Sequence, residues 1–230
     1  MKQPDILPSD DTARIDEILK TSWRILKTRF IDKRYEISRE APFQHYFAHI
    51  ISTIGDTYCI TRSEKFMVDL EVKLEEKNNN DKGKKNYIDI TCGFSSGEED
   101  SQEKTAIELK FKTKGQSAID DGRIAAFKDL KKLELASKED SYAQGRFFMI
   151  TDCQTYINES KKGKVGKEFP THDGAETQAS QTFCYTKKKK EMEFTLDDPY
   201  SFNWEKIDKK TTKKEEWYFL EIPVLKTRTN

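Results

Sequence analysis

Hydrophobic and polar positions repeat along this chain with two different periods, and the changes of period divide it into expected helices and strands. Residues 11–30 and 38–55 place apolar side chains every three to four positions, which is the spacing of amphipathic helices. Asp10 and Asp11 are suitable N-caps for the first helix, and Gly55 ends the second. The second helix has the clearest apolar stripe, which consists of Phe43, Tyr46, Phe47, Ile50, Ile51 and Ile54.

A different period begins at residue 66, where apolar and polar residues alternate strictly up to residue 76. This pattern predicts a strand with one solvated face. Two further strands, residues 87–94 and 105–113, follow polar connections, so we expect the three strands to form consecutive hairpins. The apolar face of the first strand should carry Val68, Leu70, Val72 and Leu74.

The middle of the chain returns to helical spacing. A helix is expected over about residues 121–136, and a short one over residues 154–161. Between them lies the continuous apolar run 147–150, which indicates a strand covered on both faces. Residues 161–177 are rich in glycine and lysine and are expected to form a loop.

The last third of the chain predicts strands again. A hairpin is expected from residues 182–186 and 191–196, and a final strand from residues 217–225. Because Pro223 has no N–H to donate to a sheet, we place that final strand at an edge. The order of all these elements predicts an α/β fold with a mixed central β-sheet flanked by helices. No repeat or clean linker interrupts it, so a single domain over residues 1–230 is expected.

Composition narrows the class of protein without naming a function. Hydrophobic residues make up 35%, charged residues 36% and aromatic residues 11% of the chain, which is polar but sufficient for a folded core. No apolar run is long enough to span a membrane, and the N-terminus lacks an apolar signal core, so we expect a cytoplasmic protein with no membrane partner. A net charge of zero means that any nucleic-acid contact depends on local clusters of lysine.

The cysteines and histidines offer weaker chemistry. The four cysteines are far apart and lie among apolar residues, so we expect buried reduced thiols, with a zinc site or disulfides as the alternatives. His45 and His49 are four residues apart on the polar face of the second helix, which is a zinc-compatible spacing. No glutamate stands between them in a His-Glu-x-x-His arrangement.

Acidic residues in two expected strands carry the strongest functional hypothesis. Asp89 lies in the second strand, and Glu108 and Lys110 lie two positions apart in the third, on one face of it. Glu-x-Lys recurs elsewhere in this charged chain, so only its setting in a central strand is informative. Burying charges is costly unless they are paired or bind a metal. Two carboxylates from adjacent strands are ligands suited to Mg²⁺ or Mn²⁺, but an exposed salt bridge is the competing interpretation.

The succession of helix, hairpin with Asp89, strand with Glu108 and Lys110, helix and strand resembles the PD-(D/E)XK nuclease superfamily, which has the restriction-endonuclease-like fold. The resemblance covers about residues 36–161, and residues 162–230 would be a C-terminal extension with a hairpin and an edge strand. The chain departs from the family pattern at Ile88, which stands where many members have proline.

The resemblance implies a role for each matching residue. Asp89, Glu108 and the backbone carbonyl of Leu109 would hold Mg²⁺, with Mn²⁺ as an alternative, and Lys110 would be the catalytic lysine. Many members also carry a glutamate on the helix before the hairpin. Glu40 is the best match, with Glu36 as a rival and an ordinary helix-terminal charge as the other interpretation.

The implied function is a metal-dependent DNA endonuclease of the restriction or defence type, similar to type II restriction enzymes. Many such enzymes form homodimers, so a homodimer is an option here. The alternative is a catalytically inactive module of the same fold that binds nucleic acid or protein. In a nuclease, two groups of residues would contact the DNA backbone: Lys114, Gln116 and Ser117 after the third strand, and the hairpin residues Lys187, Lys188, Lys189 and Lys190.

Overall fold

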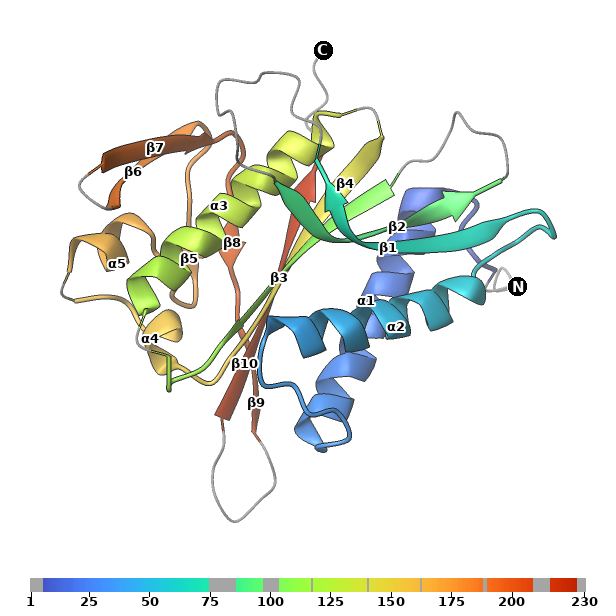
Figure 1. Ribbon diagram of the computed structural model, residues 1–230, viewed down its shortest axis with the longest axis horizontal. Helices are drawn as coiled ribbons and strands as arrows, with labels where there is room; N and C mark the ends of the chain where they lie inside the picture. The colour runs from blue at the N-terminus through green and yellow to red at the C-terminus, as the bar shows by residue number, and fades with distance from the viewer. Residues whose placement is uncertain are drawn as a thin grey trace, which may run out of the picture.

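A six-stranded sheet with the strand order β1-β2-β3-β4-β10-β9 forms the centre of the computed structural model (Figure 1). The structure describes residues 6–74, 86–96, 104–116, 118–139, 141–161, 163–187, 190–208 and 216–226. The strands are β1 (Lys65–Lys73), β2 (Tyr87–Ser95), β3 (Lys104–Lys112), β4 (Tyr142–Thr151), β9 (Glu205–Asp208) and β10 (Glu216–Leu225). β3 and β4 are parallel and all other neighbours are antiparallel, so the expected mixed α/β sheet is confirmed.

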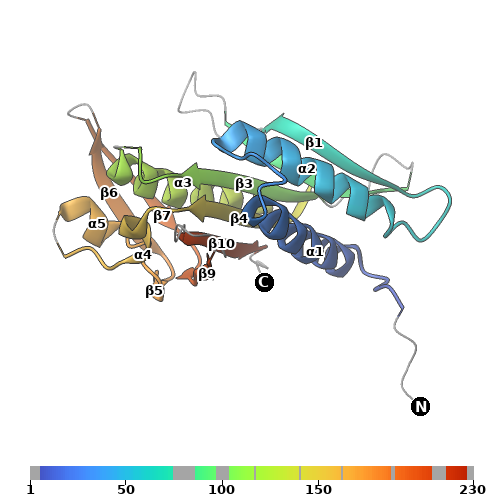
Figure 2. The same ribbon diagram turned by 90° about the horizontal axis from the view of Figure 1, so that it is seen from below.

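Helices cover both faces of this sheet. α1 (Asp11–Ile31) and α2 (Glu40–Asp56) pack side by side, and α3 (Ile119–Ser137) connects the parallel strands β3 and β4 (Figure 2). α1 begins as its sequence predicts, because the carboxylate of Asp10 accepts a hydrogen bond of 2.7 Å from the N–H of Ala13. None of the described helices combines the length and apolar composition that crossing a bilayer requires.

Two hydrophobic cores lie on the two faces of the sheet. α1 and α2 pack on one face of β3, where Ile107, Leu109 and Phe111 are buried. α3 packs on the other face, which carries Ala106 and the polar residues of β3. The apolar run of β4 divides its side chains between the two cores, which confirms that this strand is covered on both faces.

The strict alternation expected for the first hairpin breaks in its middle. Glu71 has a φ of 53°, so the two-residue alternation of β1 does not continue through it. Leu70 is 47% exposed and Leu74 belongs to the α3 core, which contradicts the expectation of one continuous apolar face. β2 changes sides at the same level, since Ile88 lies in the α3 core and Ile90 in the core of α1 and α2.

The C-terminal part of the chain completes the central sheet. β10 pairs with β4 at residues 218–225 and with β9 at residues 216–219, so the prediction of an edge strand was wrong for the first half of β10. β9 was not predicted from the sequence pattern. Pro223 lies opposite Arg146 in the part of β10 beyond the pairing with β9, which explains how the sheet accommodates a residue without an N–H.

The remaining elements lie on the α3 side. β6 and β7 form the expected hairpin, whereas the segment expected to be a loop between residues 161 and 177 contains a short helix and a strand (Figure 1). The bounds are α4 (Gln154–Ile157), α5 (Lys164–Glu168), β5 (Ala175–Glu176), β6 (Gln181–Lys187), β7 (Lys190–Leu196) and β8 (Ser201–Phe202). The four cysteines are free, and Cys184 is exposed, contrary to the expectation that all four are buried.

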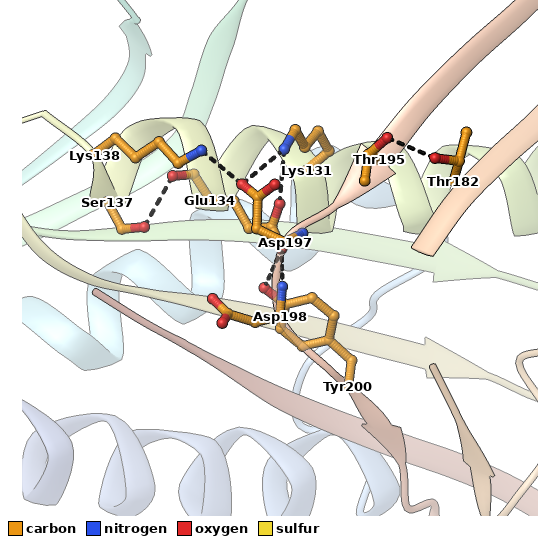
Figure 3. Close-up of polar contacts among 9 residues, drawn as sticks. All are labelled: Lys131, Glu134, Ser137, Lys138, Thr182, Thr195, Asp197, Asp198 and Tyr200. Atoms are coloured by element: carbon orange, nitrogen blue, oxygen red, sulfur yellow. Dashed lines mark hydrogen bonds and ion pairs between the residues drawn. The ribbon is translucent and has the colours of Figure 1, made fainter. Parts of the chain in front are cut away.

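A buried carboxylate fastens the connection between β7 and β8 to α3 (Figure 3). Oε1 of Glu134 accepts hydrogen bonds from the N–H of Asp197 (2.8 Å), the N–H of Asp198 (3.1 Å) and the hydroxyl of Tyr200 (2.9 Å). Its Oε2 pairs with Nζ of Lys131 at 3.0 Å. We call these five residues the α3 clasp. Both oxygens of the Glu134 carboxylate have partners, so the clasp ties α3 to the connection between β7 and β8.

Candidate active site

The two carboxylates predicted from the sequence meet where β2 separates from β3. The pairing of these strands ends at Ile90 and Ile107, and one residue further along the same register Asp89 stands opposite Glu108. Oδ2 of Asp89 accepts a hydrogen bond of 2.7 Å from the backbone N–H of Leu109. The side chain of Asp89 thus takes the place of a backbone partner at the fork and lies beside Glu108.

Glu108 is buried in a way that leaves one oxygen free. The residue is 1% exposed and projects from β3 toward α3. Its Oε2 pairs with Nζ of Lys132 on α3 at 2.6 Å. Its Oε1 is also buried but has no hydrogen-bond partner in the described part of the chain. A buried acceptor without a partner is costly, so this oxygen needs a proton or a cation.

Lys110 lies on the same side of β3 as Glu108 and is held by acidic residues from two helices. Its Nζ is 2.7 Å from Oδ2 of Asp129 on α3 and 3.7 Å from Oε1 of Glu40, the first residue of α2. The same oxygen of Glu40 is 3.8 Å from Nζ of Lys112. Glu40 is therefore the glutamate that the fold brings to β3, while Glu36 is exposed in the segment before α2.

Asp129 and Lys132 complete the cluster and were not predicted. They are three residues apart on α3, with 4.0 Å between Nζ of Lys132 and Oδ1 of Asp129. The sequence held one signal, because a polar pair at this spacing lies on one helix face. In a chain with 36% charged residues, that spacing alone does not separate a site from a solvated surface. We call Asp89, Glu108, Lys110, Asp129 and Lys132 the fork cluster.

Gln44 on α2 is another neighbour that sequence reasoning missed. Its Nε2 donates to the backbone carbonyl of Asp89 at 2.6 Å and to Oε1 of Glu71 at 2.9 Å. Gln44 therefore ties α2 to both strands at the level where their alternation breaks. This contact supports the backbone of Asp89 at the fork.

Burial and neighbouring charges shift the pKa of Asp89 and of Glu108 upward. Desolvation raises the pKa of Asp89 from 3.8 to about 6, although the N–H of Leu109 and the charge of Lys110 oppose this. Desolvation also raises the pKa of Glu108 well above its ordinary value, and the charges of Asp129 and Asp89 raise it further. Both carboxyl groups therefore gain from a nearby cation.

Lys110 behaves in the opposite way. Desolvation lowers the pKa of its amine, but the charges of Asp129 and Glu40 outweigh that loss, so the pKa ends above the ordinary value of 10.5. The side chain is consequently an ammonium ion at neutral pH. An ammonium can stabilise developing negative charge, but it cannot accept a proton from water.

The donor atoms at the fork fit a hard divalent cation such as Mg²⁺ or Mn²⁺. They are the carboxylates of Asp89 and Glu108, including the unpartnered Oε1, and the carbonyl of Leu109, which accepts a contact of 3.3 Å from Nζ of Lys110. Among the described residues, no group of three or more His, Cys, Asp or Glu side chains could hold a metal ion. The donor set at the fork has only two such side chains, Asp89 and Glu108, because its third donor is the backbone carbonyl of Leu109.

None of the expected DNA-contacting residues whose side chains the structure describes belongs to the fork cluster. Lys114 and Gln116 are exposed after β3, and the N–H of Lys114 donates to Oδ1 of Asp152 at 2.7 Å. Ser117, Lys188 and Lys189 lie outside the described residues, as do the side chains of Lys187 and Lys190. Figures 1 and 2 place the β6–β7 hairpin across α3 from α2.

A groove elsewhere on the molecule has a volume of about 470 Å³ and runs between α1 and the strands β9 and β10. It contains none of the predicted site residues. Its basic and acidic side chains partly neutralise each other, since Lys27 pairs with Glu205. His45 and His49 are likewise exposed and stay outside the fork cluster.

Comparisons with known proteins add no further assignment. No protein-family model matches this chain, and neither a curated protein nor a solved structure matches it. The resemblance to the PD-(D/E)XK superfamily therefore stays a hypothesis drawn from the residues. The fork cluster is the feature of the molecule on which a function can be argued.

Proposed function

We propose that this protein is a metal-dependent nuclease that hydrolyses phosphodiester bonds, with DNA as its substrate. One observation carries the proposal. The partly buried carboxyl group of Asp89 and the fully buried one of Glu108 converge at a strand fork, with Lys110 on the same strand as Glu108. A central strand without a charged ligand would be expected to carry apolar residues at these positions.

The metal ligands and the two groups beside them have roles that follow from their surroundings. Asp89, Glu108 and the carbonyl of Leu109 would hold Mg²⁺ or Mn²⁺, and such a metal supplies Lewis acidity toward a phosphoryl oxygen and acidifies a bound water. Lys110 remains an ammonium ion, so its role is to stabilise the negative charge that develops on the phosphate. Glu40 is 44% exposed at its side chain and holds Lys110 and Lys112 from the open side.

A nucleic-acid substrate is favoured by the lysines that follow Lys110 near the end of β3, and DNA is the nucleic acid that we propose. Lys112 follows Lys110 on the same face of the strand, and Lys114 follows with a side chain that is 76% exposed. Lysines at such a spacing suit successive phosphates of a nucleic-acid backbone. A restriction or defence endonuclease that acts in the cytoplasm, alone or as a homodimer, is the niche that this proposal gives to the protein.

A second candidate function follows from the ion pairs of the same cluster. Lys132 pairs with Glu108, and Lys110 pairs with Asp129, so β3 and α3 already neutralise part of each other's charge. A fold that needs no metal for its stability would suit a catalytically inactive module that binds nucleic acid or protein. The unpartnered Oε1 of Glu108 is the observation that favours the enzyme over this module.

The deciding experiment is a cleavage assay with supercoiled DNA, linear DNA and single-stranded RNA, each with Mg²⁺, Mn²⁺ or a chelator. We expect nicking or linearisation of DNA with either metal and none with the chelator. Asp89→Asn and Glu108→Gln should abolish cleavage, whereas Asp69→Asn, an exposed acid on β1, serves as the matched control and should cleave normally.

The outcome separates the two candidates. Intact DNA and RNA under every metal, together with DNA retention in a gel-shift assay, would support the inactive module. Cleavage that survives Asp89→Asn and Glu108→Gln would show that any nuclease activity arises away from the fork.

A further inference from the structure

We infer that Lys132 is an internal counter-ion of Glu108 that competes electrostatically with the divalent metal, so that metal binding displaces its ammonium group. This inference rests on the proposed metal site and assigns a regulatory role to a residue outside the Asp…Glu-x-Lys pattern. It concerns how the site changes between its metal-free and its metal-bound forms.

The position of Lys132 shows why it acts as a cation substitute. Its Nζ lies 2.6 Å from Oε2 of Glu108 and donates to the carbonyl of Tyr87 at 2.7 Å, at the start of β2. The side chain is 18% exposed, and that of Glu108 is 1% exposed, so water screens the pair weakly. Because Oε1 and Oε2 belong to one carboxylate, a divalent cation at the unpartnered Oε1 would stand close to this ammonium group and repel it.

The geometry also provides a place for Lys132 after displacement. Oδ1 of Asp129 is 4.0 Å from its Nζ, so this carboxylate is an acceptor within reach on the same helix. The other oxygen of Asp129 holds Lys110 at 2.7 Å. If Lys132 moves onto Asp129, it weakens the attraction between Asp129 and Lys110. Metal binding at Glu108 would thereby release Lys110 toward a phosphate.

The first test measures binding of Mn²⁺ alone by isothermal titration calorimetry, so it needs no activity. Lys132→Met should bind Mn²⁺ at least about tenfold more tightly than wild type, because a unit positive charge within about 4 Å of the ligand is gone. Lys128→Met is the matched control. Lys128 lies on the same helix, but its Nζ is 5.4 Å from the ring centre of Tyr185, so the change should leave Mn²⁺ affinity within about twofold.

A second measurement uses the wild-type protein and avoids any folding defect of the variant. The reactivity of each lysine toward an acetylating reagent is measured by peptide mass spectrometry with and without saturating Ca²⁺ or Mn²⁺. Displacement predicts that acetylation of Lys132 rises several-fold with metal, while that of Lys128 stays constant. In Asp89→Asn, which lacks one metal ligand, the rise at Lys132 should disappear.

The results distinguish failure of this inference from failure of the proposed function. If wild type binds Mn²⁺ and Asp89→Asn does not, but Lys132→Met shows unchanged affinity or Lys132 shows unchanged acetylation, the metal site stands and the competition is wrong. If neither wild type nor Lys132→Met binds Mn²⁺, both the competition and the proposed metal-dependent function are wrong.

Discussion

Asp89 accepts a hydrogen bond of 2.7 Å from the backbone N–H of Leu109, and this contact joins β2 to β3 just beyond the point where their ladder pairing ends. Leu109 lies between Glu108 and Lys110, so the bond also sets the position of Asp89 relative to both of them. The acid that the sequence places in one strand is thereby fixed beside the Glu-x-Lys of the next.

Asp89→Asn should separate structure from catalysis. The amide oxygen of asparagine can still accept the hydrogen bond from Leu109, so the fold should remain, but the charged metal ligand is lost. Because loss of an outer partner of a metal ligand typically costs about 10- to 100-fold, loss of the ligand itself should lower DNA cleavage by more than about 100-fold. Plasmid nicking and circular dichroism check the two halves of this prediction. A variant that cleaves at the wild-type rate would contradict it.

Stability should depend on pH through Asp89. Its pKa is 3.8 ordinarily and about 6 in the folded protein, so between these values the folded state binds more protons than the unfolded state. The free energy of unfolding in the presence of a chelator should therefore fall as pH rises through this window. Asp89→Asn has no titrating carboxyl group at this position, so its stability should not fall for this reason. Urea titrations at several pH values should show its stability relative to wild type growing from about pH 4 to about pH 7. A difference that is constant with pH would refute the burial of this carboxyl group.

Lys110 should act as a fixed cation. Lys110→Met is expected to lower the kcat of cleavage by roughly 10²- to 10³-fold, the usual cost of losing a group that stabilises transition-state charge. Lys110→Arg keeps the charge and should retain part of the activity. The raised pKa keeps Lys110 protonated throughout the working range. The pH–rate profiles of wild type and Lys110→Arg should therefore have the same shape at low pH. A general base would instead give a low-pH loss of activity in wild type that Lys110→Arg lacks. Such a loss would indicate that Lys110 is a general base.

Asp129 should position Lys110 without being indispensable. Its Oδ2 holds Nζ of Lys110 at 2.7 Å, and Glu40 offers a second, longer contact at 3.7 Å. Asp129→Asn should lower kcat by about 10- to 100-fold with little change in KM for DNA, as expected for a supporting partner. The control is Asp121→Asn, an exposed acid in the first turn of the same helix. Equal effects of the two changes would argue for a general electrostatic influence of α3.

The α3 clasp should contribute strongly to the free energy of unfolding. Glu134→Ala removes the acceptor of two backbone N–H groups and one hydroxyl and leaves Lys131 with less compensation. Breaking a buried ion pair in this way should lower the free energy of unfolding by about 3–5 kcal/mol, measured by urea denaturation. Glu191→Ala, at an exposed position on β7, should change it by less than about 0.5 kcal/mol. A loss below about 1 kcal/mol for Glu134→Ala would show that the clasp is not structural.

The helices and most strands of the central sheet could be predicted because local patterns determine them. The stripe of α2, the N-cap Asp10 and the two-sided burial of β4 follow from spacing and capping alone. The break of β1 at Glu71 could not be predicted. The apolar and polar residues of this segment alternate in the sequence whether or not one of them adopts a positive φ. β9 was missed because its four residues carry no period and pair only with a strand already in place.

The candidate site divides in the same way. The sequence by itself determined that Asp89, Glu108 and Lys110 lie on neighbouring strands, because a two-residue period and short connections specify the hairpins. Only the tertiary structure decided that β2 leaves β3 at Asp89 and that Asp129 and Lys132 complete the cluster. The physical reason is that the burial of a charge and its partners depend on the packing of α3 across the sheet, and a charge pattern along the chain does not specify that packing.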